Sequence, residues 1–188
     1  IDNIECDVSN YSSVKSAARK VKKMRTPIKA FINVAGTASM NMAVTTDEST
    51  VQKLIQTTLA GTIYCCQLFA PIMLRQRYGS FINFSTIAVA LALKGESVYA
   101  ASKAGVEAFS RTFAREMADF NIRVNCIAPG PIRTDLLRGI TDTQIQKITS
   151  QQIIPKQFQK SDVCDLVELL IDEKASSLSG QVLNVGGV

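Results

Sequence analysis

The segment Tyr99-Ala100-Ala101-Ser102-Lys103 lies near the start of a helical pattern at residues 98–119, between strand-like runs at residues 80–85 and 122–127. Strand, helix and strand in this order form the crossover unit of a parallel sheet. The alternation continues on both sides, with strand-like runs at residues 1–8, 29–34 and 181–185 and helical patterns at residues 11–24, 48–77 and 161–172. We therefore predict an α/β fold, and the length of 188 residues predicts a single domain, residues 1–188.

Two irregular stretches are expected within this pattern. Pro71 lies inside the helical pattern at residues 48–77 and should bend or restart the helix, because proline removes a backbone hydrogen-bond donor. After the strand at residues 122–127, the chain is broken by Pro129-Gly130-Pro131 and continues as a polar, helix-prone stretch at residues 134–159.

The composition excludes several classes of protein. Lys and Arg number 21 against 16 Asp and Glu, a formal charge of +5, and 46% of the residues are hydrophobic, so a folded protein is expected. The absence of His excludes imidazole bases and most catalytic zinc sites, and we expect no metal. Five dispersed cysteines without CxxC spacing predict reduced thiols in a cytoplasmic compartment. No run of consecutive apolar residues approaches the roughly 18 that a membrane-spanning helix needs, so no membrane partner is expected.

The i,i+4 spacing of Tyr99 and Lys103 places the phenol and the ammonium on one face of the predicted helix. A tyrosine has a pKa near 10, and lowering it by about 3 units to suit proton exchange near neutrality requires roughly 4 kcal/mol. An ammonium about 4 Å away supplies roughly that energy at an effective dielectric constant of about 20. The pair therefore fits an acid–base tyrosine, although a surface Tyr–Lys pair without a function has the same spacing.

Further motifs lie on both sides of this pair, most of them at the end of a predicted strand. They are Asp7-Val8, Asn33-Val34-Ala35-Gly36, Gly79-Ser80-Phe81-Ile82-Asn83-Phe84-Ser85-Thr86, Pro129-Gly130-Pro131-Ile132-Arg133-Thr134 and Ser179-Gly180-Gln181-Val182-Leu183-Asn184-Val185-Gly186-Gly187. Together with the Tyr99/Lys103 pair, and in this order, they resemble the motifs of the short-chain dehydrogenase/reductase family. The resemblance covers essentially the whole chain, which is identified as a member of that family.

The resemblance implies a doubly wound, Rossmann-type parallel sheet with the family's strand order 3-2-1-4-5-6-7. The first two strands of the family and its Gly-rich phosphate turn have no counterpart in these residues, which begin at the third strand. We therefore expect the strand at residues 1–6 to lack its partner and the strand at residues 29–34 to expose an apolar edge. The chain is expected to be a portion of a longer protein.

The resemblance also implies the catalytic groups. Tyr99 donates a proton, and Lys103 lowers the pKa of the phenol and holds the nicotinamide ribose. A hydroxyl polarises the carbonyl, and in many relatives it lies thirteen residues before the tyrosine, a position that Thr86 occupies here. Ser85 is its neighbour, and adjacent strand residues point to opposite faces, so only one of the two should reach the substrate. We favour Thr86 over Ser85.

The implied cofactor is a nicotinamide dinucleotide, NADP(H) ahead of NAD(H), although the residue that distinguishes them follows the absent second strand. The residues expected to bind it are Asp7, Val8, Asn33, Ala35, Gly36, Tyr99, Lys103, Pro129, Gly130, Ile132 and Thr134. Gly36 lets the backbone approach the cofactor with no Cβ in the way. Asp7 contacts the adenine or, in the alternative interpretation, caps the following helix.

We predict an NAD(P)(H)-dependent oxidoreductase that transfers a hydride between nicotinamide and a carbonyl or alcohol, most similar to 3-oxoacyl-[acyl-carrier-protein] reductases. Leu136, Leu137 and Ile140 indicate a partly apolar carbonyl substrate, which an acyl carrier protein could carry. Thr58 stands where the family usually has an Asn that organises a water-linked proton relay with the lysine. This substitution and the absent phosphate turn leave open a second interpretation, a non-catalytic Rossmann-type binding or scaffold protein.

The resemblance further implies a homodimer or homotetramer built on the helices at residues 48–77 and 98–119. These helices carry more apolar residues than one buried stripe needs, which predicts a second apolar face. The residues concerned are Ile63, Phe69, Phe109 and Phe113.

A basic face on the helix at residues 11–24 has two interpretations. Its cations are Lys15, Arg19, Lys20, Lys22 and Lys23. The face is either a docking surface for nucleic acid or an acyl carrier protein, or a solvated helix surface. No aromatic residues interleave with the charges, which favours the solvated surface and predicts no nucleic-acid partner.

Overall fold

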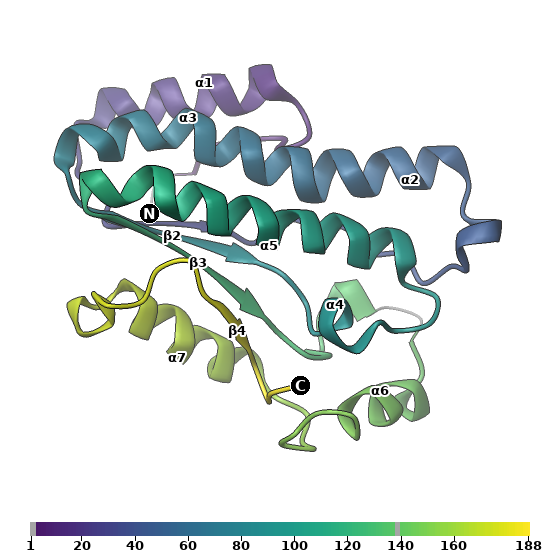
Figure 1. Cartoon of the computed structure of the whole chain (residues 1–188). Coiled ribbons are helices and arrows are strands. Elements are labelled where there is room, and N and C mark those ends of the chain that lie inside the picture. The colour runs from purple at the N-terminus through teal and green to yellow at the C-terminus, as the bar shows by residue number, and fades with distance from the viewer. Residues whose placement is uncertain (1–2, 138–139) are drawn as a thin grey trace.

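The computed structural model describes residues 3–137 and 140–188, and within them the strands form one parallel sheet. Its strands are β1 (Ala30–Asn33), β2 (Gly79–Phe84), β3 (Ile122–Ala128) and β4 (Val182–Asn184), in the order β1-β2-β3-β4 (Figure 1). Each strand is parallel to its neighbour, so the chain returns to the same edge between strands. The predicted α/β fold with a parallel sheet is confirmed.

Helices cover both faces of the sheet, as a doubly wound fold requires. On one face lie α1 (Tyr11–Met24), α3 (Gly61–Gln76) and α5 (Ser97–Met117), and on the other lies α7 (Lys160–Ile171) (Figure 1). Shorter helical segments complete the described chain: α2 (Glu48–Leu54), a π-helical turn (Ile55–Ala60), α4 (Ala88–Leu91), α6 (Asp142–Thr149) and 3₁₀ turns at Ala43–Thr45, Ala118–Phe120, Asp135–Leu137 and Glu173–Ala175.

A row of aromatic rings fills the core between the sheet and its first layer of helices. The Phe69 ring of α3 lies 4.3 Å from that of Phe31 in β1, and Phe81 of β2 lies 5.4 Å from Phe113 of α5. Phe69 and Phe113 are buried by these contacts, and Phe109 stacks on Phe113. The prediction that these phenylalanines form a second, exposed apolar face is therefore wrong for Phe69 and Phe113, because the core uses both.

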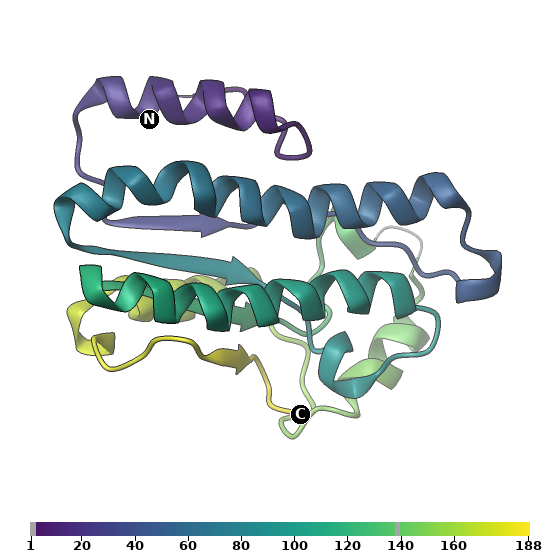
Figure 2. The ribbon, with the colours of Figure 1, turned by 45° about the horizontal axis from the view of Figure 1, so that its top comes forward.

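The helix predicted at residues 48–77 forms as α2, the π-helical turn and α3, which follow one another as one long rod beside α5 (Figure 2). The helix does not restart at Pro71, since α3 continues through it to Gln76. Proline has no backbone N–H, so the carbonyl of Gln67 lacks the donor that residue 71 would otherwise supply. Pro71 and Gln67 both lie on the exposed side of the helix, and this carbonyl therefore faces solvent. The irregularity lies instead at Ile55–Ala60.

The same rod corrects the expectation about membrane helices. Residues Glu48–Gln76 form a helix long and apolar enough to cross a membrane by length and hydropathy alone, a test that the core helix of a folded domain also passes. In the structure α1 and α5 pack against this rod, and its buried residues include Cys66, Phe69 and Met73. The packing explains the apolar composition.

The expected first strand does not join the sheet. Ile1 and Asp2 lie outside the described residues, and the rest of the run, residues 3–6, has no strand partner within the described chain. Ile4, Cys6 and Val8 instead pack against the edge of the main core. β1 is consequently an edge strand, and Ile32 remains 39% exposed, in agreement with the expected apolar edge.

A buried chain of polar side chains ties two strands to α5. The Asn33 amide donates to Asn83 Oδ1 at 2.7 Å, and the Asn83 amide donates to Ser110 Oγ at 2.7 Å. The Ser110 hydroxyl in turn donates to the Val106 carbonyl. Because Asn83 is fully buried in the central strand, this network sets the position of α5 over the ends of β1 and β2.

We predict that Asn83→Ala destabilises the protein, because it removes the oxygen acceptor of the Asn33 amide, leaves that amide its weaker bond of 3.4 Å to the Cys66 sulfur, and opens a cavity. Loss of the bond between the two buried amides alone costs roughly 1–3 kcal/mol. Asn41→Ala is the matched control, since Asn41 is exposed and bonds only to Ser39. Urea unfolding of both variants measures the difference, and an equal loss of stability in the two would contradict the structural role of Asn83.

Candidate active site

A cavity of about 1080 Å³ opens at the carboxyl ends of the strands. Its walls come from the segments that follow β1, β2 and β3, from the first turns of α5 and from α6 and α7. Parallel strands direct their carboxyl ends to the same edge, so loops far apart in sequence meet there. Ligands of open α/β sheets bind at this edge, and the cavity is therefore the candidate active site.

Tyr99 and Lys103 lie together on this wall. Both side chains are buried, with exposed fractions of 7% and 6%, and both border the cavity. Their i,i+4 spacing on α5 brings Lys103 Nζ to 6.0 Å from the centroid of the Tyr99 ring. The ammonium donates a hydrogen bond of 2.7 Å to the carbonyl of Phe84 at the end of β2, which anchors α5 to the sheet at this point.

The electrostatics of the pair differ from the prediction. Burial raises the pKa of Tyr99 to about 12, against a hydrogen bond with Thr86 that lowers it, and the charge of Glu96 raises it further. Burial also lowers the pKa of Lys103 to about 8. Lys103 is not among the causes of this shift, because its ammonium bonds to the Phe84 carbonyl and desolvation dominates, so the predicted lowering of the Tyr99 pKa by Lys103 stays a prediction.

The two candidate hydroxyls have separate partners. The Ser85 hydroxyl donates to Glu107 Oε1 at 2.6 Å, and Glu107 also pairs with Arg111 at 3.2 Å. Thr86 is half-buried, and its hydroxyl oxygen accepts a bond from the Ala88 amide at 3.2 Å. Both residues border the cavity, and the Thr86 side chain is the one that acts on the phenol, where it lowers the pKa of Tyr99.

Gly36 faces Lys103 and Thr58 across a narrow space. A Cβ at Gly36 would lie 3.6 Å from Lys103 Nζ and 3.7 Å from Thr58 Oγ1, so the absent side chain leaves room beside the ammonium. Thr58 is fully buried within the π-helical turn, and its hydroxyl bonds weakly to the Thr37 carbonyl at 3.5 Å. Room of this kind beside a buried cation fits the ribose of a dinucleotide.

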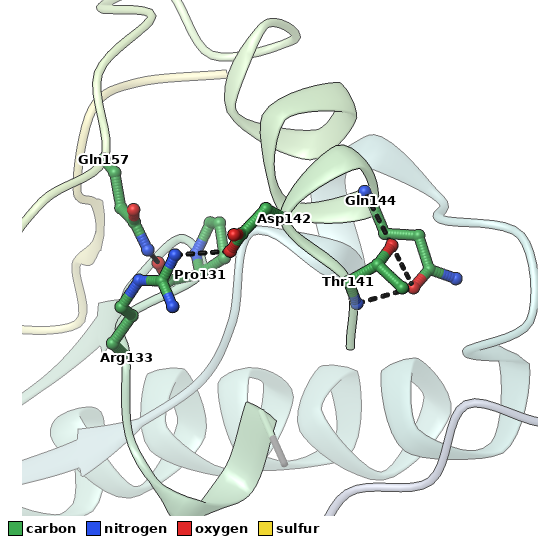
Figure 3. Close-up of polar contacts among 6 residues, drawn as sticks. All are labelled: Pro131, Arg133, Thr141, Asp142, Gln144 and Gln157. Carbon is green, nitrogen blue, oxygen red and sulfur yellow. Dashed lines mark hydrogen bonds and ion pairs between the residues drawn. The ribbon is translucent and has the colours of Figure 1, made fainter. Parts of the chain in front are cut away.

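The loop after β3 forms the opposite wall, and Pro129, Gly130, Ile132 and Thr134 all border the cavity. A Cβ at Gly130 would overlap the amide oxygen of Gln152, so the Gln152 side chain would have to move to admit any other residue. Figure 3 shows how the loop is held to α6: Arg133 pairs with Asp142, and the Gln157 amide reaches the Pro131 carbonyl at 3.4 Å. The capping box of Thr141 and Gln144 fixes the start of α6 (Figure 3).

Four of the predicted cofactor residues do not border the cavity. Asp7 bonds to the amide and hydroxyl of Ser9, which lowers its pKa, and Asn10 rather than Asp7 caps α1. Val8 packs against Gly61, and the Asn33 side chain belongs to the buried network described above. Ala35 is exposed beside Gly36. Their predicted contacts with a cofactor remain untested.

Two acidic residues of this region were not identified from the sequence as site residues. Glu96 borders the cavity three residues before Tyr99, and Glu107 holds the Ser85 hydroxyl. The i,i+4 relation between Lys103 and Glu107 was a visible signal for the second, since it puts both on the same face of α5. Glu96 had no such signal, because its position depends on the turn before the helix.

Comparisons with known proteins agree with this geometry. The family model described as "Enoyl-(Acyl carrier protein) reductase" matches residues 1–187. The chain is 32% identical over 184 residues to the 3-oxoacyl-[acyl-carrier-protein] reductase FabG of Staphylococcus aureus, covering 98% of this chain and 75% of that protein. It is 31% identical over 185 residues to the 3-oxoacyl-[acyl-carrier-protein] reductase MabA of Mycobacterium bovis, covering 98% and 74%.

Solved structures share the fold over nearly the whole chain. A structure of ElxO with NADP bound has a TM-score of 0.86 at 26% identity and covers 95% of this chain and 74% of that one. A short-chain type dehydrogenase/reductase from Mycobacterium ulcerans has a TM-score of 0.88 at 27% identity, covering 96% and 66%. Family model, relatives and fold agree with the cavity and its Tyr99/Lys103 pair: the chain belongs to the short-chain dehydrogenase/reductase family and is an NAD(P)-dependent oxidoreductase.

Proposed function

We propose that the protein reduces 3-oxoacyl groups carried as thioesters on an acyl carrier protein, with NADPH as the reductant. The observation that carries the proposal is a cavity with two different ends. Tyr99, Lys103 and Thr86 form a polar end, and α6 with the turn before it contributes aliphatic side chains. Those side chains are Leu136, Leu137, Ile140, Ile145 and Ile148. A 3-oxoacyl group would place its carbonyl at the polar end and its alkyl chain against the aliphatic side chains.

The relatives support the substrate and the cofactor. FabG of S. aureus and MabA of M. bovis are both 3-oxoacyl-[acyl-carrier-protein] reductases, at 32% and 31% identity. ElxO holds NADP in its structure. We therefore favour NADP(H) over NAD(H). The cytoplasmic location and the homodimer or homotetramer implied by the family stay predictions, and light scattering of the full-length protein measures the second.

The chain's own residues divide the chemistry. The Thr86 hydroxyl and the Tyr99 phenol converge where a substrate carbonyl oxygen would bind, and Tyr99 gives that oxygen its proton. A phenol with a pKa of about 12 is protonated at neutral pH, as a proton donor must be, but it is a weak acid unless a cation stabilises its phenolate. Lys103 carries the positive charge that stabilises the phenolate left behind. When bound, the nicotinamide supplies the hydride that reaches the carbonyl carbon.

The direct test uses the full-length protein with NADPH and S-acetoacetyl-N-acetylcysteamine, a small thioester of a 3-oxo acid. NADPH oxidation should depend on the thioester, and Tyr99→Phe should lower kcat by roughly 10²–10⁴-fold, because no other group of the proposed site is placed to give the proton. Tyr11→Phe is the matched control, since Tyr11 lies on α1 away from the cavity. NADPH binding without thioester-dependent oxidation would instead indicate the non-catalytic binding protein.

For the hydroxyl, we predict that Thr86→Ala is far more damaging than Ser85→Ala. Loss of one hydrogen bond to the developing oxyanion costs about 2.7–4 kcal/mol in transition-state stabilisation. Ser85→Ala removes only the bond to Glu107 and should change thermal stability more than kcat/KM. Steady-state kinetics of both variants decides between them, and a larger loss of kcat/KM in Ser85→Ala would reverse the assignment.

Lys103→Met should abolish activity and stabilise the folded protein at pH 7. Burial lowers the lysine pKa from 10.5 to about 8, so below pH 8 the fold carries a poorly solvated charge. Removing the charge should raise the free energy of unfolding by roughly 3 kcal/mol. The lost bond to the Phe84 carbonyl offsets roughly 1 kcal/mol of this gain. Between pH 8 and 10.5 the unfolded wild type binds the extra proton, so wild-type stability rises with pH and the advantage of the variant shrinks.

Denaturant unfolding of the wild type and Lys103→Met at pH 7 and pH 10.5 measures this difference. A variant less stable than the wild type at pH 7 would show that the buried ammonium contributes to stability rather than costing it.

A further inference from the structure

Glu96 occupies an unusual position at the start of α5. It is the residue just before the helix, where an acidic side chain ordinarily accepts hydrogen bonds from the free amides of the first turn. Its side chain makes no such capping bond. Instead it is buried, with an exposed fraction of 8%, and borders the cavity three residues before Tyr99. Glu96 therefore does not cap the helix through its side chain and is instead part of the cavity wall.

The negative charge of this carboxyl group reaches the reacting end of the cavity. Glu96, at the cap of α5, and Tyr99, in its first turn, border the same cavity, and the charge of Glu96 is the smallest of the causes that raise the pKa of Tyr99. Burial raises the pKa of Glu96 itself. Among the described residues, the other charged groups that border the cavity are Lys103, whose ammonium bonds to Phe84, and Lys160 and Glu168 on α7. Among these groups, Glu96 is the acidic one that belongs to the Tyr99 wall.

We propose that Glu96 selects the substrate: it accepts a hydrogen bond from a neutral donor on the substrate and excludes substrates that carry a carboxylate beside the reacting carbonyl. This inference rests on the proposed reductase function. A buried carboxylate repels a second carboxylate strongly, because little solvent screens the two charges. It also binds an amide N–H or hydroxyl more tightly than a neutral acceptor does. Amide-bearing oxo thioesters are therefore accepted, and free 3-oxo acids are rejected.

The test compares three probes that share one reacting carbonyl. Acetoacetate carries a carboxylate, methyl acetoacetate is neutral, and S-acetoacetyl-N-acetylcysteamine is a neutral thioester with an amide N–H. The full-length wild type should prefer methyl acetoacetate to acetoacetate, measured as the ratio of kcat/KM values with NADPH. Glu96→Gln keeps the size of the side chain and should reduce that ratio by about tenfold or more, through a higher kcat/KM for acetoacetate.

Two further variants separate charge from shape. Glu96→Leu should also reduce the ratio and, because it removes the acceptor, should lower kcat/KM for the amide-bearing thioester relative to methyl acetoacetate by about fivefold or more. Glu116→Gln makes the same chemical change on the exposed side of α5 and should leave every ratio as in the wild type. Thermal unfolding of each variant establishes that it is folded.

The outcomes are distinct. If the wild type reduces the thioester but Glu96→Gln and Glu96→Leu discriminate between acetoacetate and its ester as the wild type does, the role of Glu96 is wrong and the proposed function stands. If the wild type reduces none of the three probes, the proposed function fails and the inference fails with it. A loss of discrimination in Glu116→Gln equal to that in Glu96→Gln would also overturn the inference, because a remote charge would then suffice.

Discussion

The buried ammonium of Lys103 is the constraint on which the arrangement of the site depends. A charged group with an exposed fraction of 6% needs partners, and the carbonyl of Phe84 supplies one at the end of β2. That bond fixes the distance between α5 and the sheet edge. The space left by Gly36 and the hydroxyl of Thr58 lie on the other side of the same ammonium. Strand ends, helix and loop therefore meet around one buried charge.

Much of this architecture could be predicted from the sequence, because it depends on periodicity and ordered motifs. α1 begins and ends where the pattern indicated, and the spacing of Tyr99 and Lys103 correctly predicted one shared face. The N-terminal run was predicted as a strand that lacks its partner, and its described part, residues 3–6, pairs with no strand of the described chain. Nor could the spacing reveal that burial raises the pKa of Tyr99, because desolvation depends on everything packed around the phenol.

Side-chain partners were harder to predict than elements. The alternation of strand residues predicted that only one of Ser85 and Thr86 reaches the substrate, but both border the cavity, and what separates them is the bond of the Ser85 hydroxyl to Glu107. Asp7, by contrast, matches the family motif expected to contact the adenine, but its carboxylate accepts hydrogen bonds from the amide and hydroxyl of Ser9. A motif fixes where the backbone runs. Which atoms meet there depends on the hydrogen bonds that neighbouring loops offer, and these have no sequence period.

The π-helical turn at Ile55–Ala60 joins α2 to α3 and sets how α2 is rotated relative to the site. Such a turn holds one residue more than the α-helical ladder around it needs. Each residue of an α-helix advances the chain by about 100° around the axis, so the extra residue sets the angular phase of α2 against α3. Shortening this stretch by one residue would turn α2 by roughly that angle and carry Thr58 away from Gly36. The number of residues in the turn, and not their polarity alone, thus decides which side chain faces Gly36.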